Sequence, residues 1–386
     1  EYVTGNVVFD TVIVVLNIPV QFEYGWIRDN EKIDAALWVG HPGLNGAVAV
    51  GEALNGTINP SGRLADIYAA DFTKDPTFAN MGKNDQVENG TTRYTYSDDG
   101  NESRYFAVEY EEGIYYGYKY YETRFASMMQ ENYGTAAQGE LAVYSEELKN
   151  DAQQWYTENV IYPFGYGGSY TTFEWSDASF TEKTDENGDV YYDVEVTVTN
   201  TGSCAGKDVV ELYYTAPYYA GEVAKSFVQL GDFVKTKSLK PGQSQRVSIK
   251  LYLQDMASFD ADDDNGNSSS GYELDAGTYT LKLMRDSHNE AAAPDGQSLT
   301  FDFTIDTDIV YTQDRVTGAD VEVRFSNKDQ YDTLNRTEET DEMGLTGDMT
   351  LLSRDDWEGT WPTTPMVSEG ESAIALTDSQ YDRMRT

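Results

Sequence analysis

Short apolar runs separated by turns mark the first 70 residues. Residues 12–16 have the sequence Val-Ile-Val-Val-Leu, and residues 35–39 repeat this apolar character about one helix length later. Continuous β-branched runs are typical of strands buried on both faces in a parallel sheet. Apolar residues between positions 43 and 54 recur at steps of three and four, which predicts a helix packed on that sheet. The pattern therefore predicts an α/β fold for residues 1–70.

The apolar period changes to two after residue 170. Val194, Val196 and Val198 alternate with polar residues, and positions 247–251 and 279–283 show the same alternation. Alternation is typical of strands that turn one face toward a core. Turn-forming sequences separate these strands: Asn200-Thr201-Gly202, Lys240-Pro241-Gly242 and Asp275-Ala276-Gly277. We therefore predict an all-β sandwich over residues 171–306.

Two further regions carry weaker patterns. Residues 71–170 are predicted to be a connecting region packed on both domains, with a helical stretch near residues 138–155. Within it, residues 111–121 are too rich in tyrosine to be a disordered linker, so they should be ordered against a partner domain. Residues 307–386 are polar and lack a periodic apolar pattern, which predicts a connector with one aromatic anchor at residues 357–361.

Charge narrows the classes of partner. The 386 residues include 67 Asp and Glu against 27 Lys and Arg, a formal net charge of −40 spread along the chain. Nucleic acid and anionic membrane surfaces would be repelled, whereas neutral partners such as sugars remain compatible. A homo-oligomer is also left open.

The cysteine count and the length of the apolar runs limit the possible disulfides, metal sites and membrane spans. Cys204 is the only cysteine, so the chain can form no internal disulfide and no cysteine-rich zinc site. No run of 18 apolar residues and no signal peptide are visible in the sequence. The compartment is therefore undetermined, with a secreted or cell-envelope location favoured over a cytoplasmic one.

Several linked motifs resemble one enzyme family. These are a strand ending in Asn at residues 12–17, a strand and glycine-rich turn at 37–47, and Asn-Pro-Ser-Gly-Arg-Leu at 59–64. Gly-Tyr-Lys-Tyr-Tyr at residues 117–121 and Pro-Phe-Gly-Tyr-Gly at 163–167 continue the series. Together with the turns at 200–207 and 239–242, they are similar to the C-terminal half of glycoside hydrolase family 3, over roughly residues 8–305. The resemblance implies an α/β sandwich followed by a fibronectin type III-like domain.

Two departures refine the resemblance. Leu44 and Asn45 stand where the family usually has a Gln-Glu pair, so no polar role is expected at these positions. The residues after Arg63, together with residues 355–360, look like a permuted branch of the family. In that branch the catalytic (β/α)8 barrel follows these domains. Residues 307–386 would then lead into a barrel that this chain lacks.

The resemblance implies retaining hydrolysis of terminal β-linked sugars, so the substrate would be an oligosaccharide or β-glycoside. This reaction needs two carboxyl groups about 5 to 5.5 Å apart. In the family the nucleophilic Asp comes from the barrel and the Glu acid/base from a loop of the α/β sandwich that has no counterpart here. We therefore expect no catalytic residue in this chain and no cofactor. Two alternatives remain, a non-catalytic carbohydrate-binding or cell-surface scaffold protein and an N-acetylhexosaminidase of the same superfamily.

Single residues offer few binding candidates. His41 follows the second predicted strand, where ligands approach open α/β sheets, and is the one candidate for substrate contact. Asn59 and Ser61 are better explained as turn residues that bond to their own backbone. His288 has no evident partner for a catalytic triad.

Metal and phosphate sites are not predicted. The alternating acids Asp260, Asp262 and Asp264 suggest a calcium loop, but the ligand spacing fails because position twelve would be Gly271. The glycines of residues 165–168 lack the lysine of a phosphate loop and instead predict a close packing joint. Five aromatic residues are predicted to be buried joints between the domains: Tyr115, Tyr118, Tyr120, Tyr121 and Phe164.

Overall fold

The computed structural model describes residues 9–80, 93–98, 101–106, 110–323 and 350–362. The chain divides into two compact units. The first comprises residues 1–72 and 114–324, and the second comprises residues 73–113 and 325–386. The four domains expected from the sequence stay a prediction.

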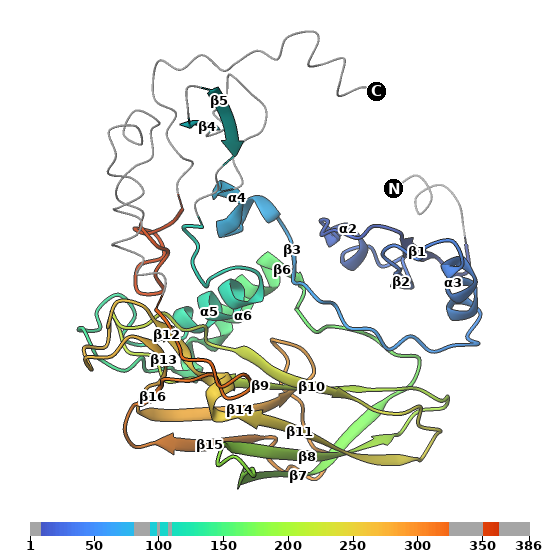
Figure 1. Ribbon diagram of the computed structural model, residues 1–386. Helices are drawn as coiled ribbons and strands as arrows, with labels where there is room; N and C mark the ends of the chain where they lie inside the picture. The colour runs from blue at the N-terminus through green and yellow to red at the C-terminus, as the bar shows by residue number, and fades with distance from the viewer. Residues whose placement is uncertain (1–8, 81–92, 99–100, 107–109, 324–349, 363–386) are drawn as a thin grey trace. The chain divides into compact units, whose positions relative to one another are not determined.

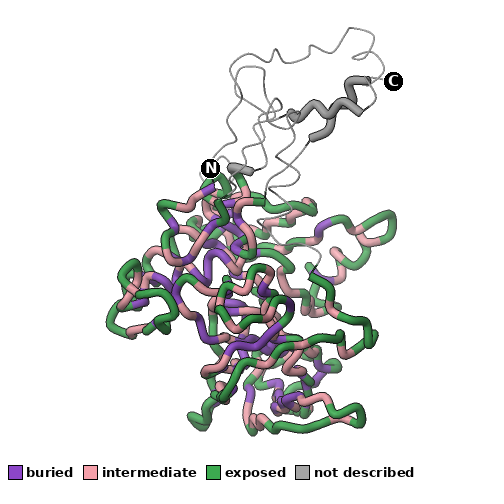
Figure 2. Tube along the Cα trace, turned by 60° about the vertical axis from the view of Figure 1, so that its left-hand side comes forward, coloured by how far each residue is buried: buried purple, intermediate pink, exposed green. Residues whose placement is uncertain are grey.

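Two antiparallel sheets form the largest part of the first unit (Figure 1). They share one core that includes Trp175, Val196, Leu212 and Leu281, all at most 1% exposed. Figure 2 shows buried residues mainly inside the traced part and exposed residues along its outer loops. In spatial order, one sheet consists of β10 (Gln229–Lys235), β9 (Val209–Thr215), β14 (Gly277–Met284) and β15 (Thr300–Ile305). The other consists of β11 (Ser244–Tyr252), β8 (Val190–Asn200) and β7 (Phe173–Thr184). The three alternating runs expected from the sequence are confirmed as strands and lie in β8, β11 and β14.

A small third sheet extends this core. After the 3₁₀ turn η3 (Leu253–Met256), β12 (Ser258–Asp260) pairs with β13 (Gly271–Leu274), which pairs with β16 (Ile309–Tyr311). Ile309 lies opposite Leu274 and packs against the core. The predicted connector therefore begins later than residue 307, because a short apolar strand at its start completes this sheet. Residues 324–349 and 363–386 of that prediction lie outside the described residues.

The N-terminal residues form the predicted strands and helix. β1 (Ile13–Leu16) pairs in parallel with β2 (Ala35–Trp38), with the short helix α2 (Gly25–Arg28) between them, and α3 (Gly46–Leu54) follows. Burial of β1 on both faces is wrong, since Ile13 and Val15 are 44% and 40% exposed. Only one face of the two-stranded sheet packs on a core, around Tyr24, Tyr68 and Ile161. Within the described residues α3 buries only Ala53, so its predicted packing on the sheet is also wrong.

A short strand pair links the N-terminal residues to the region before the sandwich. β3 (Tyr68–Ala69) pairs with β6 (Val160–Tyr162). Between them run α5 (Tyr118–Met128), η2 (Glu146–Leu148) and α6 (Lys149–Asn159). The helix predicted near residues 138–155 thus begins later, because Gly139 adopts a positive φ and Leu141 bridges to Tyr219.

The second unit is described only in part. Its elements are η1 (Phe72–Lys74) at the boundary, α4 (Pro76–Asn80), and the hairpin of β4 (Arg93–Asp98) and β5 (Asn101–Phe106). Trp357, within the predicted aromatic anchor, is 1% exposed. Among the described residues no helix combines the length and apolar character needed to cross a membrane.

Candidate functional site: the junction around Asp208

The turn after α3 delivers Arg63 to one end of the β-sandwich. The Leu64 N–H donates to the Tyr166 carbonyl at 2.9 Å, and the Gly165 N–H donates back to the Leu64 carbonyl at 2.8 Å. These two bonds hold residues 63–64 beside the segment that enters the sandwich. Arg63 then donates through Nη1 to the Gly167 carbonyl at 2.9 Å and through Nη2 to Asp208 at 2.9 Å.

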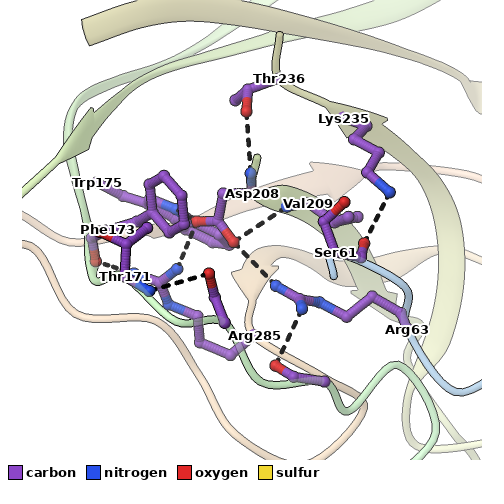
Figure 3. Close-up of polar contacts among 12 residues, drawn as sticks. Ser61, Arg63, Thr171, Phe173, Trp175, Asp208, Val209, Lys235, Thr236 and Arg285 are labelled. Atoms are coloured by element: carbon purple, nitrogen blue, oxygen red, sulfur yellow. Dashed lines mark hydrogen bonds and ion pairs between the residues drawn. The ribbon is translucent and has the colours of Figure 1, made fainter. Parts of the chain in front are cut away.

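Asp208 is the centre of this junction (Figure 3). It precedes β9, is 2% exposed, and its N–H donates to Thr236 Oγ1 at 2.9 Å. Because a carboxylate offers about four acceptor sites, its side chain is saturated by four donors. The donors are Arg63 Nη2 at 2.9 Å, the Val209 N–H at 3.0 Å, Trp175 Nε1 at 2.7 Å and Arg285 Nη1 at 2.9 Å.

Arg285, which directly follows β14, is the second cation paired with Asp208. Its guanidinium lies 3.9 Å from the centre of the Trp175 ring and donates to the Phe173 carbonyl at 3.1 Å. Burial lowers the pKa of Arg285, and the ion pair with Asp208 opposes this shift. A polar recess of about 230 Å³ lies beside both arginines. Since Asp208 has no acceptor site left, this cluster is suited to joining segments rather than to proton transfer.

The sequence did not predict a role for Asp208, although both members of the Arg63–Asp208 ion pair lie in or beside recognisable motifs. Arg63 belongs to the Asn-Pro-Ser-Gly-Arg-Leu motif, and Asp208 directly follows the Ala-Gly-Lys turn at residues 205–207. An arginine within a packed turn needs a buried acid, because an unpaired buried charge is costly. This requirement predicts that Arg63 has a buried acidic partner, but it does not predict which acidic residue that is.

Glu211 lies close to the same junction, on β9. It is 4% exposed, and Tyr213 donates to it at 2.8 Å. Burial raises the pKa of Glu211 to about 8, and the charges of Asp286 and Asp208 add to the shift, while the bond from Tyr213 and the charge of Arg63 oppose it. The carboxyl group therefore holds its proton at neutral pH.

The glycines of the predicted joint are needed for close approach. Gly165 has a φ of 82°, and a Cβ there would overlap the Glu211 carboxyl group. A Cβ on Gly167 would overlap the Gly62 carbonyl. The prediction of a close packing joint at these two glycines is thus confirmed.

His288 has partners that the sequence did not reveal. Its Nδ1 lies 2.9 Å from Glu122, which also accepts hydrogen bonds from Tyr156 at 2.6 Å and Ser287 at 2.9 Å. The imidazole stacks on the Tyr156 ring at 3.6 Å between centroids. His288 thus has hydrogen-bond partners, and the expectation that it belongs to no catalytic triad stays a prediction. Its Nε2 faces the Gln153 side-chain oxygen at 3.1 Å, so the contacts observed supply no nucleophile.

The other single-residue candidates lie apart from this junction or support it. His41 is exposed after β2, and its contact with substrate stays a prediction. Asn59 accepts from the Tyr170 N–H at 2.9 Å and donates to Ser169 at 3.0 Å and to the Ala205 carbonyl at 3.2 Å. It is structural as expected, but it bridges distant segments instead of its own turn. The Ser61 carbonyl accepts from Lys235 at 2.7 Å.

Asp260 organises its own loop. Its carboxylate accepts the N–H groups of Asp262 and Asp264, each at 3.1 Å, and of Asn265 at 3.4 Å. Neighbouring Glu273 accepts from the side chain of Asn265 at 2.6 Å. This loop thus uses its acidic oxygens to satisfy backbone and amide donors. Across the parts of the chain that the structure describes, no group of three or more potential metal ligands is found.

The predicted aromatic joints are buried to different extents. Tyr115, Tyr120 and Tyr121 are at most 6% exposed, while Tyr118 and Phe164 are partly buried. Tyr118 stacks on Phe164 with centroids 4.5 Å apart and meets the edge of Tyr213 on β9. Its hydroxyl accepts the Leu230 N–H at 3.1 Å.

Replacing Tyr118 with phenylalanine tests this joint. The ring contacts would remain, but the Leu230 N–H would lose its acceptor, so the free energy of unfolding should fall by about 1 to 2 kcal/mol. Chemical denaturation would measure the change. Tyr116→Phe is the matched control, since Tyr116 is 51% exposed on the same segment and its variant should leave stability unchanged. Equal stability of both variants would contradict a role for the Tyr118 hydroxyl.

Comparisons with known families match this architecture. Residues 6–118 match the model of the glycosyl hydrolase family 3 C-terminal domain, and residues 208–287 match that of the fibronectin type III-like domain. The β-glucosidase A of Butyrivibrio fibrisolvens is 30% identical over 346 residues, a match that covers 86% of this chain and 34% of that protein.

Solved structures give the same result. A β-glucosidase from Paenibacillus barengoltzii is 30% identical with a TM-score of 0.56, over 78% of this chain and 27% of that one. The β-glucosidase 3B of Thermotoga neapolitana, solved in complex with glucose, is 29% identical with a TM-score of 0.54, over 78% of this chain and 32% of that one. This chain thus spans about a third or less of the length of these relatives.

Proposed function

Because this chain carries the C-terminal domain of glycoside hydrolase family 3 followed by a fibronectin type III-like domain, we propose that it is part of a β-glucosidase-type enzyme. The whole protein would hydrolyse terminal β-linked sugars by the retaining two-carboxylate mechanism. The observation that carries this proposal is the 30% identity to a β-glucosidase along 86% of the chain. Both catalytic carboxyl groups would lie outside residues 1–386.

The junction around Asp208 gives this chain a role in such an enzyme. The ion pairs of Asp208 join the turn after α3 to the sandwich. The sandwich would therefore brace the α/β domain. The parallel pair of β1 and β2 supports the finer proposal that they belong to a larger, mostly parallel sheet.

We also retain the permuted arrangement as a proposal, with a (β/α)8 barrel after residue 386. The match to the Butyrivibrio enzyme supports it, because a match that covers 86% of this chain must extend beyond residue 306 into the polar C-terminal segment. At least the first part of that segment is therefore shared with a β-glucosidase. A secreted or cell-envelope location and a homo-oligomeric state stay predictions.

The relatives named above do not favour the two alternative functions. Each is named a β-glucosidase, which supports neither a non-catalytic scaffold nor an N-acetylhexosaminidase.

Activity assays on two forms of the protein test the proposal. The purified chain of residues 1–386 should show no hydrolysis of 4-nitrophenyl β-D-glucoside, whereas the product of the longer gene should hydrolyse it. Turnover by the chain alone that disappears when one of its own Asp or Glu residues is replaced would overturn the location of the site. A longer product that cleaves only the N-acetylglucosaminide, or that binds polysaccharide without cleaving any glycoside, would favour the corresponding alternative.

A further inference from the structure

A second buried ion pair joins two segments of the β-sandwich. Lys225 lies before β10 and Asp275 lies between β13 and β14, and Lys225 Nζ is in direct contact with Asp275 Oδ2. The side chains of the two residues are 3% and 4% exposed. Because β9 lies between β10 and β14 in the sheet, the contact links segments whose strands are not hydrogen-bonded to each other.

Hydrogen bonds hold the backbone beside each member of the pair. Next to the acid, the Ala276 N–H donates to Asp308 Oδ1 at 2.7 Å. Close to the lysine, the Phe227 N–H donates to Thr123 Oγ1 at 2.9 Å. The amine and the carboxyl group are therefore brought together by the fold itself. A fixed approach of this kind is what makes a reaction between two groups of one molecule fast.

The surroundings of Asp275 do not suit an ionised carboxylate. Its Oδ1 is buried and has no hydrogen-bond partner among the described residues. A carboxylate offers about four acceptor sites, and a buried charge is costly unless it is both paired and hydrogen-bonded. Asp208 in the same sandwich, by contrast, accepts from four donors. The orphaned oxygen indicates that an uncharged form of the Lys225–Asp275 pair is favoured.

An uncharged pair of this kind can react further. Transfer of one proton from Lys225 to Asp275 leaves a neutral amine beside a neutral carboxylic acid. The lone pair of Nζ then attacks Cγ of the acid, and a C–N bond forms. A C–O bond breaks, and its oxygen leaves as water with one proton from the amine and one from the carboxyl group. The product is an amide, and the reaction needs no oxidant, reductant or further reactant.

We propose that Lys225 and Asp275 become joined by an intramolecular amide bond, an isopeptide, in the folded chain. The bond would link residues 50 positions apart and would span β9 at one end of the sheet. Since Cys204 is the only cysteine, the chain cannot obtain such a cross-link from an internal disulfide. The bond belongs to the sandwich and does not depend on glycoside hydrolysis, so it goes beyond the function proposed above.

Mass spectrometry of the purified and denatured chain tests the proposal. The intact mass should be lower than that of the sequence by the mass of one water molecule. Trypsin should not cleave after Lys225, and the digest should contain residues 208–235 joined to residues 251–282 as one branched peptide. Lys225→Arg is the matched variant, because a guanidinium keeps the positive charge but stays protonated and so cannot attack the acid. This variant should have the full mass of its sequence.

An exposed pair in the same sandwich provides the internal control. Lys183 and Asp193 pair at 2.5 Å, with side chains 46% and 13% exposed. Because water solvates this pair, both groups should stay ionised, and their tryptic peptides should appear separately in the same digest.

Two results would overturn the proposal. One is a chain of full mass that trypsin cleaves after Lys225. The other is a loss of water that persists in Lys225→Arg, since the dehydration would then lie elsewhere in the chain. If this variant fails to fold, the branched peptide of the unsubstituted chain still decides, because it is identified after denaturation. None of these readouts involves glycoside cleavage, so the proposed function can fail independently.

Discussion

Replacing Asp208 with alanine is expected to lower the free energy of unfolding by about 3 to 5 kcal/mol, the usual cost of removing one member of a buried ion pair. The variant leaves Arg63 and Arg285 without their counter-charge and Trp175 Nε1 without its acceptor. Urea denaturation followed by tryptophan fluorescence would measure the loss. Because Arg63 and Asp208 come from different segments, residues 1–70 should also become sensitive to limited proteolysis before the sandwich does.

An exposed ion pair provides the matched control. Glu146 and Lys149 pair at 2.9 Å, with side chains 79% and 51% exposed. Glu146→Ala should therefore change stability by only about 0.5 kcal/mol or less. An Asp208→Ala variant that loses no more stability than Glu146→Ala would show that the junction does not hold the segments together.

Replacing Glu211 with glutamine should remove a pH dependence from the stability of the chain. The pKa of Glu211 is raised from 4.5 to about 8, so between these values the folded chain holds a proton that the unfolded chain releases. Stability from this group is complete below pH 4.5 and is lost as pH rises to about 8. The total loss should be about 3 to 5 kcal/mol. Glutamine stays neutral, so the variant should avoid this loss.

The measurement is the change in unfolding free energy between pH 5 and pH 8.5, compared between the two proteins. A comparison of changes removes any constant effect of the glutamine amide on packing. Glu174→Gln, at an exposed position on β7, should behave like the unsubstituted chain. A Glu211→Gln variant with the same loss between these pH values would show that Glu211 ionises normally in the folded chain.

Elements set by local pattern could be predicted from the sequence. Val194 and Val196 alternate with polar neighbours and lie in β8, and the apolar runs near Val14 and Leu37 lie in β1 and β2. Each of these patterns fixes a backbone conformation within a few residues. Burial is a different matter, because it depends on what covers an element. Val15 is a β-branched residue in a continuous apolar run, which is typical of a buried strand. It is nevertheless 40% exposed, because only one face of its sheet packs on a core.

The polar contacts could not be predicted because they join residues far apart in sequence. His288 is hydrogen-bonded to Glu122, which lies 166 positions away in the sequence, and Arg63 to Asp208, which lies 145 positions away. With 67 acidic residues available, nothing local to either basic residue selects the right carboxylate. Glycine positions were more informative. Gly165 in the Pro-Phe-Gly-Tyr-Gly motif predicted a close approach, although not that the approaching group would be Glu211.

The pairing of β3 with β6 has a consequence for how this region can vary. The chain leaves the pair at Ala69 and returns to it at Val160, so the residues between them form a detour whose two ends are already fixed side by side. Lengthening a detour of this kind adds little closure entropy. Insertions between these points should therefore leave the pair intact where they avoid α5 and α6, whose buried side chains contact the sandwich. The exposed loop at residues 134–140 is thus a natural place for related chains to differ in length and for an engineer to attach a new domain.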